Sequence, residues 1–189
     1  MKSKFTKSVV ALLAVFALTA VGVAQASAHE FNASVEGTLE GKASSVQEFL
    51  FSSGGTKSLC KTAAISGKVV KGSQKTVKET VKYGECNYFG FSMKVTPAEY
   101  EFSAEGTVSV LKKVTFEMPL LGCAVTLEPG TGLNSVSYKN LSAGKLESKL
   151  VLTGLKFTGS GGSCGTGPST GSAVGNLEST LPSGTIEWK

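Results

Sequence analysis

Residues 58–83 read SLCKTAAISGKVVKGSQKTVKETVKY. Two segments of this stretch, Ser58–Val70 and Thr76–Tyr83, contain many β-branched residues, and apolar side chains alternate with polar ones along them. The turn residues Lys71-Gly72-Ser73 separate the two segments. A period of two is typical of a half-buried strand, because neighbouring side chains of a strand point to opposite faces of the sheet. The stretch therefore predicts a pair of strands joined by a turn.

The same pattern recurs along the chain, with further turn signals at Glu105-Gly106 and Glu128-Pro129-Gly130. Many short strands at regular spacing favour a sandwich or a barrel over βαβ units. We expect an all-β fold, a single-domain antiparallel β-sandwich or barrel. The additional predicted strands are Phe31–Leu39, Val46–Phe51, Phe91–Thr96, Glu99–Phe102, Thr107–Leu111, Val114–Met118, Ala124–Leu127, Ser135–Tyr138, Leu146–Phe157 and Thr185–Trp188.

Two segments need separate treatment. Leu141–Leu152 has a pattern that a helix could also show, but Gly144 and the β-branched residues that follow Val151 favour a strand. Ser160–Gly175 is rich in glycine and serine, and we expect a mobile surface loop held at Cys164.

The four cysteines are Cys60, Cys86, Cys123 and Cys164. An even number in an exported chain indicates two disulfides. A zinc site is the alternative, but the chain has no C-x-x-C pair and contains a single histidine. Three pairings are possible, and we favour the sequential one, Cys60–Cys86 and Cys123–Cys164. The fold is thus expected to be cross-linked by two disulfides.

The N-terminal residues have the pattern of a secretory signal peptide. Lys2, Lys4 and Lys7 precede an apolar run over Val9–Leu18, and the small residues Ala24–Ala28 follow it. A positive start, a short apolar centre and an A-x-A site define such a signal, although a membrane anchor is the alternative. Cleavage falls after Ala26 or Ala28. We favour Ala28, so residues 1–28 are the signal peptide and 29–189 the secreted all-β domain.

The composition argues against some classes of partner. The mature part keeps 161 of the 189 residues, and its basic residues are all lysine, because the chain contains no arginine and no aspartate. Calcium loops depend on aspartate, and bidentate recognition of phosphate or guanine depends on arginine. We therefore expect no nucleic-acid partner. No later segment is apolar enough to span a bilayer, so we also expect no membrane span after signal cleavage.

Two short matches to catalytic motifs occur. Gly161-Gly162-Ser163-Cys164-Gly165 matches the G-x-S-x-G pattern of serine hydrolases, and Ser142–Lys145 has the S-x-x-K spacing of penicillin-recognising enzymes. Both motifs need partners that this chain lacks, since its one histidine is His29 and neither S-D-N nor K-T-G occurs. We predict no catalytic, cofactor-binding or metal-binding residues. A weak copper site at an N-terminal His29 is the alternative that remains.

Three further groups have both a structural and a functional interpretation. Glu99 and Glu101 share one face of a strand, as paired carboxylates of a glycoside hydrolase could, but we favour the interpretation of a solvated face. Tyr88-Phe89-Gly90-Phe91 either packs under a disulfide or stacks on sugar rings. A basic stretch either forms an exposed strand pair or attracts an anionic polymer; it comprises Lys68, Lys71, Lys75, Lys78 and Lys82.

Several segments resemble an uncharacterised family of secreted, disulfide-containing β-rich proteins found in multiple copies in soil actinobacteria. The similar segments are Phe51–Thr56 with Cys60–Ala63, Tyr83–Cys86 with Phe89-Gly90, Gly122–Leu127, Pro129–Leu133 and Val136–Asn140. The resemblance covers most of Phe51–Phe157. It implies export and a β-rich fold, and it adds no activity.

These observations together predict a secreted, non-enzymatic domain. We expect it to act as an extracellular or cell-envelope binding or structural module, with the cell-envelope surface or a polysaccharide as partner. The first alternative is a carrier that holds a small hydrophobic ligand inside a barrel. The second is a carbohydrate-processing enzyme that uses the pair of glutamates.

Overall fold

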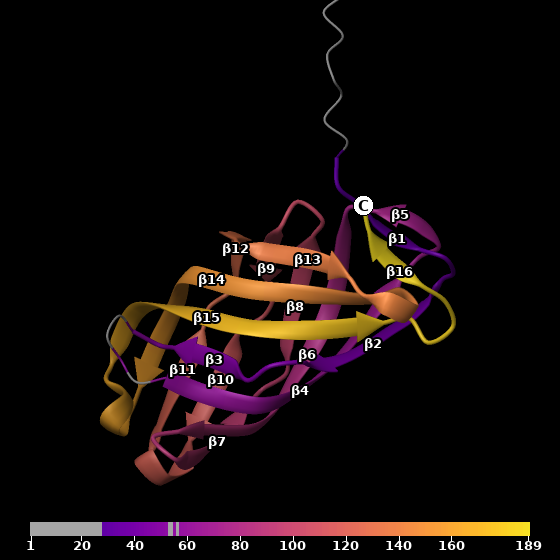
Figure 1. Cartoon of the computed structure of the whole chain (residues 1–189). Helices are drawn as coiled ribbons and strands as arrows, with labels where there is room; N and C mark the ends of the chain where they lie inside the picture. Colours follow the sequence, from indigo (N-terminus) through magenta and orange to yellow (C-terminus); the bar gives the residue numbers. More distant parts are fainter. Residues whose placement is uncertain (1–27, 53–54, 56) are drawn as a thin grey trace, which may run out of the picture.

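The computed structural model describes residues 28–52, 55 and 57–189 (Figure 1). In this part of the chain the secondary structure consists of sixteen β-strands and three single-turn 3-10 helices, η1 (Pro119–Leu121), η2 (Ser142–Gly144) and η3 (Gly162–Cys164). None of the described helices is long and apolar enough to cross a membrane. The predicted signal peptide lies outside the described residues except for Ala28.

Eight antiparallel strands form a closed ring at one end of the molecule. Each strand pairs with the next in the order β4, β6, β7, β10, β11, β14, β15 and β3, and β3 pairs again with β4. Of the two predicted architectures the molecule therefore adopts a barrel. The strands are β3 (Gln47–Leu50), β4 (Lys57–Val69), β6 (Thr76–Tyr88), β7 (Phe91–Val95), β10 (Val114–Met118), β11 (Cys123–Leu127), β14 (Lys145–Ser160) and β15 (Gly167–Thr180).

The long strands β4, β6, β14 and β15 continue beyond this ring and acquire other neighbours. β2 (Gly37–Ala43) lies between β15 and β4, the same two neighbours that β3 has within the closed ring. β8 (Ala98–Ser103), β9 (Thr107–Val110) and β12 (Gly130–Asn134) extend the sheet from the N-terminal half of β6. β13 (Val136–Asn140) pairs with the start of β14. Strands thus surround the interior along its length.

A small three-stranded sheet covers the end of the barrel away from β7 (Figure 1). It consists of β1 (Phe31–Ala33), β5 (Gly72–Gln74) and β16 (Ile186–Trp188), with β1 in the centre. Segments near both ends of the domain therefore pair with each other. β1 and β16 also direct Phe31 and Ile186 into the interior, where both side chains are buried.

Aromatic side chains fill the interior. Within the closed ring, the ring centroids of Phe49 and Phe51 lie 4.9 and 5.0 Å from that of Phe116, and Phe51 lies 5.3 Å from Phe157. At the covered end, Phe31 contacts Tyr138 edge to face at 5.0 Å. Aromatic pairs at such distances add stabilisation beyond the burial of their area.

The longest strand, β14, shows how the alternating pattern is kept through a bulge. Its pairing with β15 shifts between Thr153 and Leu155, where Gly154 has a φ of +74°. The extra residue lets Leu152 and Leu155 both face the interior, although they are three positions apart. A glycine suits this position because side chains disfavour positive φ.

The expectation of a mobile loop over Ser160–Gly175 is wrong. β14 ends at Ser160 and β15 begins at Gly167, so most of this glycine-rich segment is a paired strand. Its glycines have a packing reason: a Cβ at Gly171 would lie 1.8 Å from the Leu50 carbonyl oxygen, and one at Gly175 would lie 1.9 Å from Gln47 Oε1. The glycines of this segment are therefore explained by the close approach of β3 to β15 and not by chain flexibility.

Other expectations about single elements have mixed outcomes. The predicted strand Phe31–Leu39 is divided into β1 and β2, while Leu146–Phe157 is confirmed within β14. β5 and β12 begin in segments that we expected to be turns, at Gly72 and Gly130. Both are short strands whose partners come from distant parts of the chain, so their own residues carry little signal.

Candidate binding groove on the outer face

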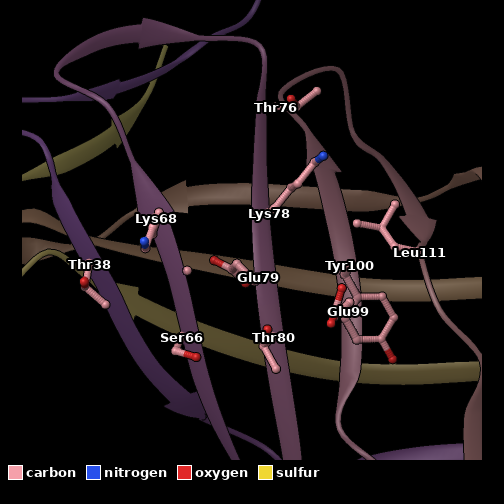
Figure 2. Close-up of a pocket in the computed structure, with 11 residues that line it drawn as sticks. Thr38, Ser66, Lys68, Thr76, Lys78, Glu79, Thr80, Glu99, Tyr100 and Leu111 are labelled. Atoms are coloured by element: carbon pink, nitrogen blue, oxygen red, sulfur yellow. The ribbon is translucent and has the colours of Figure 1, made fainter.

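A groove of about 600 Å³ runs across the outer face of four neighbouring strands, β2, β4, β6 and β8 (Figure 2). The antiparallel register positions its walls, because partners in a ladder share one face of the sheet. The side chains and backbone segments that line it belong to Thr38, Ser66, Gly67, Lys68, Thr76, Lys78, Glu79, Thr80, Glu99, Tyr100 and Leu111.

Outward side chains of these strands form two rows that run through the groove and extend beyond its lining residues. Consecutive Cα partners define the first row as Thr38, Lys68, Lys78 and Glu101. The second row contains Glu40, Ser66, Thr80 and Glu99. Each row combines charged side chains with hydroxyl groups, so the surface offers hydrogen-bond donors and acceptors side by side.

Positive charge is concentrated at the centre of the groove. Lys68 and Lys78 are direct partners in the β4–β6 ladder, and both are exposed. Lys78 Nζ lies 3.5 Å from Glu101 Oε2, whereas Lys68 has no ion pair within the described part of the chain. Like charges placed directly opposite each other destabilise a sheet. An anionic group between the two lysines would relieve this repulsion.

The wall on the β8 side carries an ion pair. Lys112 Nζ lies 2.5 Å from Glu99 Oε1, and the two side chains are partly exposed. Both glutamates that the sequence singled out, Glu99 and Glu101, therefore lie on the outer face, as their spacing predicts, and each has a lysine partner.

Glu79 lies at the floor of the groove, and its carboxyl points into the interior of the barrel. Glu79 is 8% exposed, and Ser179 Oγ donates a hydrogen bond to its Oε1 at 3.2 Å. Burial raises the pKa of Glu79 from its ordinary 4.5 to about 7, and the hydrogen bond from Ser179 opposes this rise. Close to neutral pH, this carboxyl thus exists in both protonation states.

Sequence reasoning missed Glu79, although a signal was present. Glu79 lies between Val77 and Val81, two apolar residues of the alternating segment, and all three are buried. A glutamate in step with the apolar positions of a strand is predicted to point into the core. The enclosed cavity that it lines, together with Tyr138 and Ser148, has a volume of about 10 Å³.

A second polar contact inside the barrel also borders the groove. The hydroxyl oxygens of Tyr83 and Tyr100 lie 2.9 Å apart. Burial raises the pKa of Tyr100 to about 12, opposed by its hydrogen bond with Tyr83. Burial likewise raises the pKa of Tyr83 well above its ordinary value. Both phenols stay protonated at physiological pH, so this contact is a neutral hydrogen bond.

The disulfides confirm the favoured pairing. Cys60 and Cys86 are bonded, and they are Cα partners in the β4–β6 ladder. Cys123 and Cys164 are bonded, and their bridge attaches η3 to the start of β11. Disulfides form and persist in oxidising compartments.

The basic stretch divides between the groove and its surroundings. Lys68 and Lys78 line the groove. Lys82 is exposed farther along β6, and Lys71 and Lys75 flank β5. Only two of the five lysines of the basic stretch therefore line the groove.

The aromatic segment after Cys86 is only partly packed. Tyr88 is half-buried against Phe51, with 5.8 Å between the ring centroids. Phe89 is 62% exposed and Phe91 is 41% exposed. Packing near the disulfide therefore accounts for Tyr88, whereas the rings of Phe89 and Phe91 are open to solvent at the β6–β7 turn.

The serines of the two catalytic motif matches lie in short 3-10 helices. Ser163 lies in η3, and a strand, β15, follows where a nucleophile elbow has a helix. Ser142 lies in η2, and Lys145 Nζ is 2.8 Å from Glu178 Oε1. His29 lies before β1, and its ring stacks on Trp188.

Comparison with protein-family models, with curated proteins and with solved structures found no match to this chain.

Proposed function

We propose that this chain is exported and acts in the cell envelope or outside the cell as a non-enzymatic binding module, and that the groove binds an anionic polysaccharide. One observation carries the proposal: Lys68 and Lys78 lie directly opposite each other in an open groove whose rows also contain hydroxyl groups. Lysines bind an anionic group as point charges, and hydroxyls can bond to sugar hydroxyls.

Export is supported by the N-terminal signal pattern and by the two disulfides. The resemblance to secreted proteins of soil actinobacteria agrees with it. A groove that is open along an outer face also suits a polymer, because a chain can enter from the side without passing through an entrance.

The interior of the barrel favours the module over the carrier. Ligand pockets usually measure about 300–1,000 Å³. The enclosed cavity beside Glu79 measures about 10 Å³, which is room for about one water molecule. Within the closed ring, Phe49, Phe51, Phe116 and Phe157 occupy the space that a hydrophobic ligand would need.

The glutamate pair is better explained by its ion pairs than by catalysis. Glu99 and Glu101 each have a lysine within salt-bridge distance, at 2.5 and 3.5 Å. In a hydrolase, one carboxyl of the pair must act as an acid. Polysaccharide turnover that is lost in Glu99→Gln and Glu101→Gln would reinstate the enzyme alternative.

The groove is tested by affinity electrophoresis and calorimetry with polygalacturonate, an anionic glycan, and with dextran as the neutral comparison. We expect the double variant Lys68→Glu/Lys78→Glu to bind polygalacturonate at least about tenfold more weakly, because it reverses both charges at the centre of the groove. Added salt should weaken binding by the unaltered protein, since exposed charges are screened.

The matched control is Lys149→Glu/Lys156→Glu, which makes the same change of charge on the exposed face of β14. It should bind polygalacturonate nearly as well as the unaltered protein. Equal loss in both double variants would show a response to net charge alone and would reject the groove as the site.

A further inference from the structure

The residues around His29 bring together donor atoms from distant parts of the chain. His29 precedes β1, whose central place in the small sheet puts it beside β16. The imidazole ring stacks on the indole of Trp188, with centroids 4.4 Å apart and an angle of 21° between the planes. The ring is exposed to solvent on its other side.

The two nitrogens of His29 that can chelate one metal ion, the main-chain nitrogen and Nδ1, each have an oxygen next to them. The main-chain nitrogen lies 3.1 Å from Glu105 Oε1, and Nδ1 lies 3.2 Å from the main-chain oxygen of Lys189. Two nitrogens and two oxygens, contributed by three segments of the chain, thus lie around one residue.

The surroundings hold these donors in place. The indole nitrogen of Trp188 donates to the carbonyl oxygen of Ala104 at 2.8 Å. Lys189 and Glu30 exchange two main-chain hydrogen bonds of 2.9 Å. The Lys189 oxygen is therefore held by main-chain pairing, and Glu105 follows a residue that the indole holds.

Processing after Ala28 changes the chemistry of this site. Hydrolysis of the Ala28–His29 bond consumes one water, leaving a carboxylate on Ala28 and a primary amine on His29. The lone pair of the precursor's amide nitrogen is delocalised into the carbonyl group, whereas the lone pair of the amine is free to bind a metal. The amine and Nδ1 can then close a six-membered chelate ring around a metal ion.

We propose that mature His29 binds Cu(II) through its α-amino nitrogen and Nδ1, with Glu105 Oε1 and the Lys189 oxygen completing the site. Part of the proposed function, export with cleavage after Ala28, is its premise. Imidazole suits copper, and a tetragonal set of nitrogen and oxygen donors is typical of Cu(II). Binding releases one proton from the ammonium form of the amine and requires the imidazole tautomer with its proton on Nε2.

Copper is favoured over the other divalent ions that share this donor chemistry. Affinity for a given nitrogen and oxygen site rises along the first-row metals to Cu(II) and falls again at Zn(II). Calcium and magnesium prefer sites made mainly of oxygen. A site with two nitrogens and one carboxylate therefore discriminates in favour of Cu(II).

The experiment uses the full mature domain prepared with a defined first residue by removal of an N-terminal tag that leaves no extra residue. One protein begins at His29 and the other at Ala24, so that the α-amino group of the second lies five residues before the imidazole ring. Trp188 is the one tryptophan of the chain, and Cu(II) bound at His29 should quench its fluorescence. Titration with Cu(II), checked by calorimetry, gives affinity and stoichiometry.

We expect the protein that begins at His29 to bind one Cu(II) with strong quenching. The protein that begins at Ala24 should bind at least about tenfold more weakly, because its residue 29 nitrogen is an amide and its α-amino group is too far along the chain to close the six-membered ring. Glu105→Gln in the His29 protein should weaken binding by a smaller factor. Equal affinity of the two starting forms, or binding without quenching of Trp188, overturns the site.

Two further measurements separate this proposal from the proposed function. The Lys68→Glu/Lys78→Glu protein should keep its copper affinity, whatever the result with polygalacturonate. Mass spectrometry of the protein secreted by its own host should give His29 as the first residue. Any other first residue removes the site from the natural protein, even where the prepared His29 form binds copper.

Discussion

Gly67 is the Cα partner of Glu79 in the β4–β6 ladder, so the residue opposite this buried carboxyl has no side chain. A Cβ at position 67 would lie 2.6 Å from the Lys78 carbonyl oxygen and 3.2 Å from Glu79 Cγ. The glycine thus leaves room for the glutamate beneath the groove. Sequence alternation alone places both residues on the inner face, but their contact depends on the register.

Glu79 should make stability depend on pH. Its pKa is raised by burial from 4.5 to about 7, so between these values the folded chain keeps a proton that the unfolded chain has lost. The free energy of unfolding should therefore be highest near pH 4.5, fall as pH rises to about 7, and then level off. The largest possible change from this group is about 3 kcal/mol.

Urea unfolding at pH 5, 6, 7 and 8 measures this dependence in the unaltered protein and in Glu79→Gln. The amide has no proton to lose, so the variant should be the more stable protein at pH 8 and similar at pH 5. Glu117→Gln, at an exposed position of β10, is the control and should keep the slope of the unaltered protein. A Glu79→Gln protein with that same slope would contradict the assignment.

Gly171→Ala should strongly destabilise the barrel. The added Cβ would lie 1.8 Å from the Leu50 carbonyl oxygen and 2.8 Å from Phe157 Cε2, so β3 must move away from β15. Overpacking of this kind costs about 1–3 kcal/mol. Thermal unfolding should show it, while Gly130→Ala, whose Cβ meets no atom within 4 Å, should be nearly neutral. Similar melting temperatures for both variants would mean that β15 tolerates bulk.

Each disulfide should contribute through the unfolded chain. The bonds close loops with sequence separations of 26 and 41 residues. Restriction of loops of this size is worth about 3–4 kcal/mol each in the chain-entropy model. We expect Cys60→Ala/Cys86→Ala and Cys123→Ala/Cys164→Ala to lower the free energy of guanidinium unfolding by amounts of this order. A loss under about 1 kcal/mol for either pair would show that residual structure already restricts that loop.

Asn140 should attach β16 to the barrel. Its Nδ2 donates to the main-chain oxygen of Trp188 at 2.7 Å, and its Oδ1 accepts from the Trp188 main-chain nitrogen at 2.8 Å. Asn140→Ala removes both bonds, each worth about 1 kcal/mol. We expect a loss of about 1–2 kcal/mol and a shift of Trp188 fluorescence to longer wavelength, because the indole becomes more exposed. Ser137→Ala, on the exposed face of the same strand, should do neither.

How much of the fold was predictable depended on the range of the interactions. Alternation within Ser58–Val70 and Thr76–Tyr83 is a local property, and it identified the strands that became β4 and β6. The number and export context of the cysteines predicted two disulfides, and of the three possible pairings the favoured sequential one is present in the barrel. Ser160–Gly175 was misjudged, because glycine in a strand is explained by a neighbour on another strand, in this case Leu50 or Gln47.

The candidate groove was predictable only in its parts. The sequence identified a basic stretch of five lysines that includes Lys68 and Lys78, and it placed Glu99 with Glu101 on one face of a strand. It did not distinguish the two lysines that line the groove from those that flank it, since this depends on which residues are partners across strands. The side chain of Glu79 was missed, although its position between Val77 and Val81 is a local signal.

By itself the sequence determined that this protein is built from antiparallel strands and two disulfides, because side-chain alternation and cysteine count act within or near each segment. Tertiary structure alone decided that the strands close into a ring, that Lys68 faces Lys78, and that His29 meets Trp188 and Glu105. These relationships join residues that are distant along the chain. They depend on register and closure, which are set by the packing of all strands together and not by any one of them.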